Sequence, residues 1–174
     1  MLETSRLLIR EWKDSDLEPF ADLNADPIVM EHLPGQIAKA DSDAMAGRII
    51  AHFETHGFGL YALEVKESGQ FIGYTGLSVP KFEAPFMPAI EIGWRMARSA
   101  WGFGYATEAA RAVLVHATGP LGLSNIVSFT VPQNTRSRAV MERIGLKHDP
   151  QGDFDHPAFE HGHRLRRHVL YRMA

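Results

Sequence analysis

The sequence predicts an α/β fold in which helices flank a mixed sheet. Two observations support this prediction: several segments alternate apolar and polar residues with period two, as strands do, and others carry apolar residues at helical spacing. In chain order they give βααβββαβαββ, a sheet with helices packed on it. The chain has 174 residues, 45% of them apolar and 22% charged, so one domain over 1–174 is expected.

The first half of the chain predicts a strand, two helices and a hairpin. Alternating apolar residues indicate a strand over 6–12. Asp14-Ser15-Asp16 offers capping side chains for a first helix, and a second helix is expected over 41–55. The extended segments 58–65 and 71–79 flank a polar turn, which predicts the hairpin.

The second half predicts strands separated by helices. A strand with clear period two covers 89–96, and an amphipathic helix follows Gly104. A strand over 125–131, a short helix over 135–144 and a last strand over 165–172 follow, and the order has one more strand between that helix and the last strand. The segment from Pro80 to Pro88 is expected to be a loop with exposed aromatic residues, Phe82 and Phe86, which either covers a ligand or packs as a satellite of the core.

Composition narrows the possible functions. The formal net charge of −3 creates no field that would attract nucleic acid. No apolar run approaches the ~20 residues that span a bilayer, and no secretory signal is visible at the start. The absence of cysteine excludes disulfides and thiolate metal sites and fits a reducing compartment. We therefore expect a cytoplasmic protein, a monomer or homodimer, that binds neither nucleic acid nor membranes.

A glycine-rich turn between a strand and a helix is the clearest candidate binding element. Its residues are Trp101, Gly102, Phe103, Gly104, Tyr105, Ala106, Thr107 and Glu108. Glycine permits a sharp bend close to a ligand, and the helix behind it presents unpaired N–H groups and partial positive charge. This combination suits a pyrophosphate. A P-loop would need a lysine, and a dinucleotide fingerprint would need glycine where Thr107 stands. A plain strand-to-helix turn remains the alternative.

Four segments resemble the Gcn5-related N-acetyltransferase family, in the right order and over nearly the whole chain. The turn is similar to the family pattern Gln/Arg-x-x-Gly-x-Gly/Ala, with Trp101 in the first position, as in the branch of ribosomal-protein alanine acetyltransferases. The segment 3–10 resembles that branch's opening strand, and Glu91-Ile92-Gly93-Trp94 resembles its fourth strand. Asn134-Thr135-Arg136-Ser137, ahead of Ile144-Gly145-Leu146, resembles its closing helix.

The resemblance implies a mostly antiparallel sheet whose fourth and fifth strands splay apart to hold acetyl-CoA as co-substrate. The pantetheine arm would bind near Met96 on one wall and Asn134 on the other. The pyrophosphate would bind at Gly102, Phe103, Gly104, Tyr105, Ala106 and Thr107, through the amides of 103–107. The implied reaction is direct attack by a primary amine, on a protein N-terminus or a small molecule, in a ternary complex.

Aminolysis of a thioester requires a base, an oxyanion donor and an acid. Glu91 is the candidate base, and its alternative reading is an exposed strand carboxylate or ion-pair partner. A backbone N–H near Gly93 or Trp94 is the candidate oxyanion donor.

The acid is less clear, because this chain departs from the family there. Met141 stands seven residues after Asn134, where many members have a tyrosine, and it cannot donate a proton. The hydroxyl of Ser137, a serine that the ribosomal-protein branch shares, could relay the proton instead. Asn134 and Ser137 also fit the cap and third position of a helix, and both roles are compatible.

The acceptor side is expected to be shaped by the first two helices, by 80–88 and by 152–167. The last of these holds three arginines that could attract an acidic substrate or the ribose phosphate of coenzyme A, or could form a solvated face. Its histidines lack a metal-binding spacing, so no metal is expected. A second functional hypothesis is a non-catalytic module that binds or senses acyl-CoA, which Met141 favours and Glu91 with Ser137 disfavours.

Overall fold

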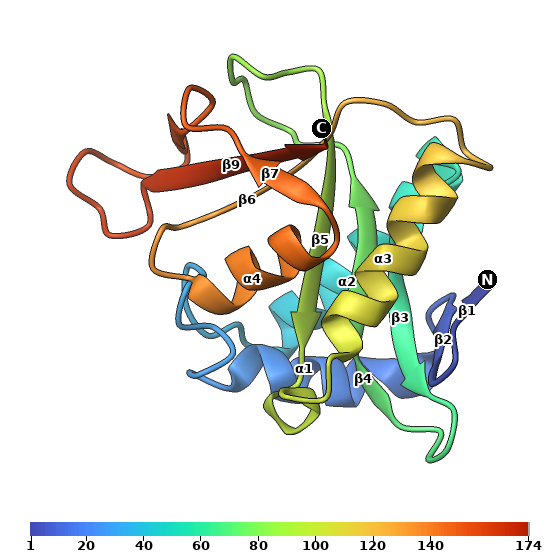
Figure 1. Cartoon of the computed structure of the whole chain (residues 1–174). Coiled ribbons are helices and arrows are strands. Elements are labelled where there is room, and N and C mark those ends of the chain that lie inside the picture. The colour runs from blue at the N-terminus through green and yellow to red at the C-terminus, as the bar shows by residue number, and fades with distance from the viewer. Residues whose placement is uncertain (174) are drawn as a thin grey trace.

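The computed structural model describes residues 1–173 and shows one sheet with helices on both faces (Figure 1). Its strands are β1 (Leu2–Glu3), β2 (Leu7–Arg10), β3 (Leu60–Val65), β4 (Phe71–Ser78), β5 (Ile90–Met96), β6 (Ile126–Thr130), β7 (Leu146–His148), β8 (Phe154–Asp155) and β9 (Arg167–Met173). Its α-helices are α1 (Leu17–Ala25), α2 (Lys39–His56), α3 (Tyr105–Thr118) and α4 (Thr135–Arg143). No helix among these combines the length and apolar character needed to cross a membrane.

The expected order of elements is confirmed, with two additions. The strands β1 and β8 have two residues each, which is too short for alternation to be visible in the sequence. Both pair at the side of a longer strand, β1 with β2 and β8 with β9.

The sheet is mixed and mostly antiparallel, as predicted. Its order is β1-β2-β3-β4-β5-β6-β9-β7, and the one parallel pair on this path is β5 with β6. These two strands pair only at Ile90↔Ile126 and Glu91↔Val127. Beyond those pairs β5 continues to Met96 while β6 turns away toward α4, so the predicted splay is present (Figure 1).

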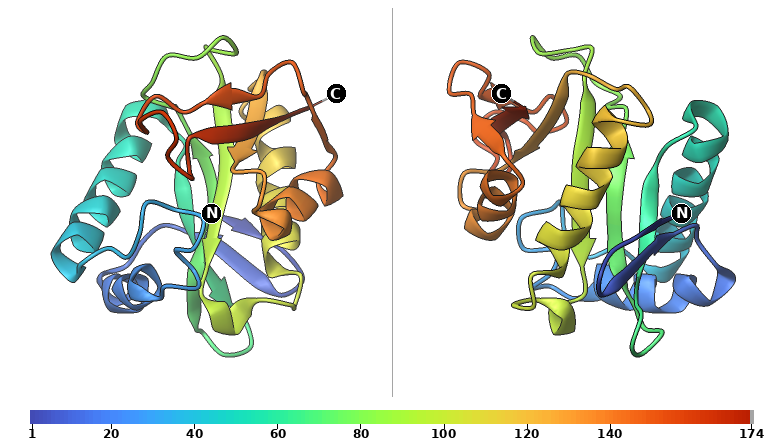
Figure 2. Two further views of the ribbon diagram at one scale, coloured as in Figure 1. Left: turned by 90° about the vertical axis from the view of Figure 1, so that its left-hand side faces the viewer. Right: turned by 45° about the vertical axis from the view of Figure 1, so that its right-hand side comes forward.

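The two helix pairs cover opposite faces of the sheet (Figure 2). On one face α3 and α4 bury a core that includes Ile92, Val113 and Met141. On the other face α1 and α2 bury a smaller core around Phe20 and Ala46. The side chains of β5 alternate between these two layers. The residues that share a face with Glu91 therefore point toward α1 and α2.

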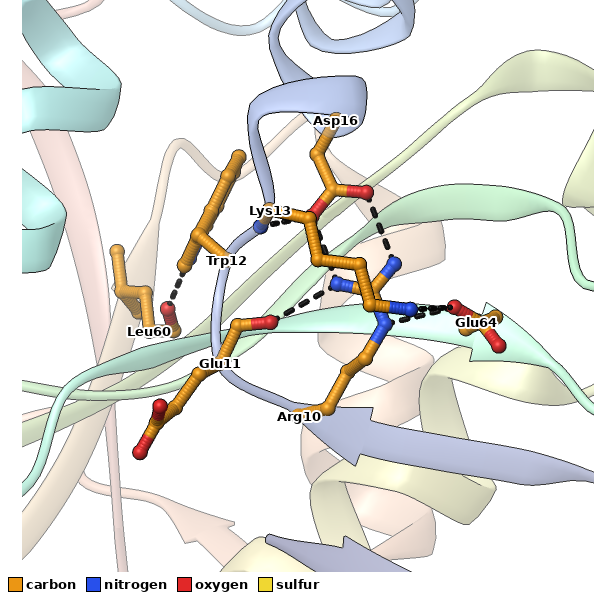
Figure 3. A network of polar contacts seen from close by, with 7 residues as sticks. All are labelled: Arg10, Glu11, Trp12, Lys13, Asp16, Leu60 and Glu64. Atoms are coloured by element: carbon orange, nitrogen blue, oxygen red, sulfur yellow. Dashed lines mark hydrogen bonds and ion pairs between the residues drawn. The ribbon is translucent and has the colours of Figure 1, made fainter.

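A buried guanidinium fastens the start of α1 to the sheet (Figure 3). Arg10 on β2 donates two hydrogen bonds to the carboxylate of Asp16, at 2.7 and 2.8 Å, and a third to Glu64 Oε2 on β3 at 2.7 Å. Asp16 also accepts the backbone N–H of Lys13 at 2.8 Å. Each charge thus has hydrogen-bonded partners, as a buried charge requires.

The expectation of exposed aromatic residues in the loop 80–88 is wrong. Phe86 is only 5% exposed, and its ring centroid lies 4.9 Å from that of Phe154 and 6.0 Å from that of Phe129. Phe82 stacks on Phe154 at 5.8 Å. The loop thus packs as a satellite of the core, which is the second of the two alternatives expected for this segment. The covering residues come from β6 and β8, a contact between distant segments that local periodicity does not reveal.

Candidate active site

The gap between β5 and β6 opens into a cleft of about 1670 Å³. Every residue predicted for the site lines it: Glu91, Met96, Gly102, Phe103, Gly104, Tyr105, Ala106, Thr107, Asn134 and Ser137. The fold therefore brings these separate segments to one place, with the turn at one end and Glu91 further along β5.

The turn before α3 requires glycine at two positions. Gly102 has φ 85° and Gly104 has φ 79°, values in the left-handed region where other residues are strained. Gly104 caps α3 without a side chain, and its carbonyl accepts the N–H of Glu108 at 3.0 Å. The N–H groups between them, from Tyr105 to Thr107, precede the first helical hydrogen bond and have no helical acceptor. They form the amide cluster that the sequence predicts for an anion.

A carboxylate in the first turn of α3 attaches this helix to the amino-terminal strands. Glu108 accepts hydrogen bonds from Thr4 Oγ1 at 2.6 Å and from the Arg6 backbone N–H at 3.1 Å, and it pairs with Arg6 Nη2 at 2.6 Å. Partial burial opposes ionisation, but the bonds from Thr4 and Arg6 prevail and hold the pKa of Glu108 below its usual value. No structural role for these residues follows from local sequence patterns, because the contact joins segments about a hundred positions apart.

The edge of β5 that faces β6 supplies unpaired backbone groups to the cleft. Ile90 N–H donates to Asn125 O on that side at 3.1 Å, and alternation along the strand directs the N–H of Trp94 and Met96 the same way. The β6 ladder ends before it reaches them. The carbonyl of Met96 accepts the indole N–H of Trp101 at 3.1 Å. The amide N–H of Trp94 therefore faces the gap as the candidate oxyanion donor.

Glu91 is a desolvated carboxyl group and not an exposed one. Burial raises the pKa of Glu91 to about 7, and a hydrogen bond from Ser78 Oγ, at 3.2 Å to Oε2, opposes the rise. No cation pairs with it among residues 1–173, so the ion-pair reading is not supported. A Cβ on Gly93 would lie 3.7 Å from Glu91 Oε1, and the glycine therefore leaves open space beside the carboxyl.

Asn134 and Ser137 occupy the cap and third position of α4, so their predicted structural role is confirmed. Asn134 Oδ1 accepts the N–H of Ser137 at 3.3 Å, and Asn134 Nδ2 donates to Thr130 Oγ1 at 3.0 Å. One lone pair and one amide hydrogen of Asn134 remain for a ligand. The cap uses only the backbone of Ser137, so its hydroxyl stays available in the cleft.

The departure at Met141 has a packing explanation. Its side chain is 1% exposed and belongs to the core beneath α4, although it also reaches the cleft wall. Tyr171 does not replace a catalytic tyrosine: it is buried, and its hydroxyl bonds Arg138 and Glu142, each at 3.1 Å. Tyr74, Ser78 and Ser128 bring hydroxyls to the cleft near β5, and that of Ser128 donates to Ile92 O at 2.8 Å.

The end of the cleft beyond Glu91, where the sequence places the acceptor, is bounded by the loop between α1 and α2; the helices α1 and α2 themselves and the segments 80–88 and 152–167 contribute no lining residue. The cleft is lined there by Ile28, Val29, His32, Leu33, Leu60, Tyr74 and Arg95. The loop 80–88 lines a separate hollow, and 152–167 contributes no lining residue. Its influence is indirect: Arg164 donates to the carbonyls of Glu31 at 2.8 Å and Leu33 at 3.4 Å, which holds the lining loop.

The other two arginines of this region form local ion pairs. Arg166 and Arg167 both pair with Asp155, at 3.1 and 3.4 Å, and so brace the hairpin of β8 and β9. Within residues 1–173 no three histidine or carboxylate side chains gather in a way that could hold a metal ion.

Comparisons with known proteins agree with this geometry. The model of the acetyltransferase (GNAT) domain matches residues 6–147. The chain is 32% identical to the uncharacterized protein YkkB of Bacillus subtilis over 83% of this chain and 84% of that protein. An acetyltransferase from Agrobacterium tumefaciens has a TM-score of 0.79 at 29% identity, covering 99% of this chain and 93% of the other.

A third relative shares the fold and was solved with a ligand. The RimL ribosomal L7/L12 α-N-protein acetyltransferase, in complex with coenzyme A, has a TM-score of 0.76 at 15% identity and covers 97% of this chain and 94% of its own. The match to the GNAT domain over residues 6–147 places this fold and its cleft in the class of acyl-CoA-dependent transferases. The chain belongs to the GNAT acetyltransferase family, and it is an acetyl-CoA-dependent N-acetyltransferase. Family membership favours the enzyme over the non-catalytic module.

Proposed function

We propose that this enzyme transfers the acetyl group of acetyl-CoA to a primary amine by direct attack in a ternary complex, with Glu91 as the base. The observation that carries the proposal is a carboxyl with a pKa of about 7, without a cationic partner among the described residues, on the splayed strand that lines the cleft. A general base works best when its pKa lies near the operating pH.

The cleft divides into two sides with different tasks. On the side of α3, the amides of Phe103 to Thr107 would hold the pyrophosphate, and the field of the helix favours an anion there. Met96 and Asn134 would contact the pantetheine arm from facing walls. The acceptor amine would enter from the side of α1 and α2, toward which Glu91 points.

The reaction needs one C–N bond to form and one C–S bond to break. Glu91 would take a proton from the acceptor ammonium, directly or through water. The lone pair that this frees on the amine nitrogen then attacks the thioester carbon. The N–H of Trp94 would stabilise the oxyanion that forms. As the C–S bond breaks, Ser137 would relay a proton to the leaving thiolate, and the nitrogen that becomes the product amide would lose a proton.

The test is release of coenzyme A thiol from acetyl-CoA against a panel of protein N-terminal peptides and small amines. Glu91→Gln should lower kcat at least 100-fold, the usual scale of general base catalysis, with little change in affinity for acetyl-CoA. Ser137→Ala should lower kcat less, because water can partly replace a relay. Glu67→Gln, in the exposed turn between β3 and β4, is the matched control. Unchanged turnover in both site variants would refute these roles.

A further inference from the structure

Arg95 is a charged side chain whose counter-charge is missing. It lies on β5, is partly buried and lines the cleft, yet it forms no ion pair among the described residues. Its Nη1 donates to the neutral Asn24 Oδ1 at 2.6 Å and lies 3.8 Å from Met45 Sδ. Its Nε is buried and has no hydrogen-bond partner. Such an unsatisfied group in a native fold calls for an explanation, because burying an unpaired charge is costly.

The position of Arg95 places this charge in the acceptor side of the cleft. Arg95 and Glu91 point to the same face of β5, and Gly93 between them adds no side chain. On the neighbouring strand Tyr74 pairs with Arg95, and Ser78 pairs with Glu91. The guanidinium carbon lies 5.5 Å from the centre of the Tyr74 ring. A base and a fixed cation thus border one open stretch of the sheet.

Arg95 is held differently from the arginines that carboxylates fix, and it differs from the other arginines without an ion pair in having a buried Nε that lacks a partner among the described residues. Arg10, Arg6 and Arg172 are fixed by carboxylates of this chain. Arg95 is fixed instead by an amide and by an aromatic face, contacts that orient a guanidinium but leave its charge uncompensated. The planar fork of arginine matches a carboxylate with two parallel hydrogen bonds.

We propose that the acceptor is a small primary amine that carries a carboxylate, of the amino-acid class, and that Arg95 binds this carboxylate. Arg95 is then a specificity-determining residue: it supplies the anchor at one end of the acceptor while Glu91 takes the proton at the other. The inference rests on the proposed function and adds the acceptor's chemical class to it.

The rest of this end of the cleft fits the same class. Ile28, Val29, Leu33 and Leu60 give apolar walls that would enclose the body of a small acceptor. A polyamine or aminoglycoside would bring further ammonium groups against Arg95, and like charges in such a site repel. A peptide amide offers Arg95 only a neutral carbonyl, which forms a weaker hydrogen bond than a carboxylate does.

The experiment compares L-amino acids with their C-terminal amides, each pair corrected for the fraction of free amine. We expect kcat/KM for the acids to exceed that of the matched amides at least tenfold. Arg95→Gln should abolish this ratio by raising KM for the acids while leaving KM for acetyl-CoA unchanged. Arg95→Lys, which keeps the charge but not the fork, should restore part of the ratio. Arg48→Gln, an exposed charge change on α2, is the control.

Calorimetry separates this inference from the proposed function. The same acids and amides are titrated into the protein saturated with coenzyme A, and the acids should bind at least tenfold tighter than the amides in the parent but not in Arg95→Gln. Acetylation of amines without any preference for the acids would overturn the inference and leave the proposed function intact. Binding of the acids without their acetylation would overturn the acid as acceptor, and it would refute the proposed function only if no amine of the panel were acetylated. Failure of every acid to bind would overturn the inference whatever the turnover.

Discussion

Burial controls the ionisation of Glu91, because the side chain has no charged partner among the described residues and one hydrogen bond from Ser78. The pKa of about 7 means that the carboxyl is half ionised at neutral pH. We expect kcat/KM to rise with pH through about 7 as Glu91 loses its proton. A pH profile measures this, and Glu91→Gln should remove the inflection near 7. An inflection that survives in Glu91→Gln would assign it to another group.

The same group makes folding less favourable at high pH. Its folded pKa of about 7 lies above the unfolded value of 4.5, so the folded state holds the proton more tightly and loses relative stability as pH rises from about 4.5 to 7. Glu91→Gln should therefore raise the free energy of unfolding at pH 8, by about 1 kcal/mol or more, and have little effect at pH 4. Denaturant unfolding at pH 4 and pH 8 measures this change. An equal change in the free energy of unfolding at the two pH values would contradict the assigned pKa.

Ser78 offers a finer test of the same carboxyl. Its hydroxyl stabilises the ionised form, so Ser78→Ala should raise the pKa of Glu91 further and move the midpoint of the pH profile upward. Thr55→Ala, at the exposed end of α2, is the control and should leave the midpoint unchanged. A midpoint that falls in Ser78→Ala would show that the hydrogen bond serves the protonated form.

For single residues, the sequence predicted which residues form the site better than it predicted what surrounds each of them. Glu91 and the turn residues could be named from local patterns and a family resemblance, and they do line one cleft. The isolation of Arg95 could not be predicted, because it depends on Asn24 and Met45 of α1 and α2 facing it without a carboxylate. Whether an arginine lacks a carboxylate partner in the fold cannot be read from the order of residues along the chain.

The element that most directly links backbone conformation to binding is the head of α3. Gly104→Val should cost about 1–2 kcal/mol of stability, because φ 79° is unfavourable for a branched residue, and should lower the affinity for coenzyme A at least tenfold by displacing the amides. Gly122, with φ 59° and open space around a Cβ, lies in the loop after α3. Gly122→Val is the matched control: it should cost similar stability and leave the affinity unchanged. Calorimetry measures the affinity of each variant for coenzyme A, and equal affinities in the two variants would exclude the turn as the pyrophosphate site.

Element boundaries followed closely from the sequence where periodicity was strong. The strand expected over 89–96 is found at Ile90–Met96, and the helix after Gly104 begins at Tyr105. The prediction that the aromatic residues of the loop 80–88 are exposed was wrong, because their burial depends on Phe154 from a two-residue strand. Short strands are fixed by their neighbours in space, so their sequences alone do not predict them.

For the molecule as a whole, the Arg10 network joins the first helix to both strands beside it. Asp16→Ala removes the carboxylate that holds the guanidinium at two points and leaves a largely buried charge with Glu64 as its remaining acid. We expect a loss of about 3 kcal/mol in the free energy of unfolding, the scale of a broken buried pair. Urea unfolding measures it, with Asp22→Ala on the exposed side of α1 as the control within about 0.5 kcal/mol. A loss no larger than the control would mean that water replaces the carboxylate.

The overall topology could be predicted because the order of locally predicted elements and the family resemblance agree on one answer. The mixed sheet and the splay of β5 from β6 are confirmed. The organisation as one domain, the cytoplasmic location and the choice between monomer and homodimer remain predictions.

The placement of the tryptophans gives the protein an internal optical probe. Trp94 and Trp101 border the cleft, with Trp101 held between the Met96 carbonyl and the guanidinium of Arg136, whose carbon lies 4.4 Å from its ring centre. Trp12 is partly buried and packs against the core under α1, with its indole donating to Leu60 O. Coenzyme A entering the cleft should therefore change the intrinsic fluorescence of two indoles and leave the third as a constant background. Trp12→Phe would remove that background, and the occupancy of the cleft could then be followed in unlabelled protein on the millisecond scale.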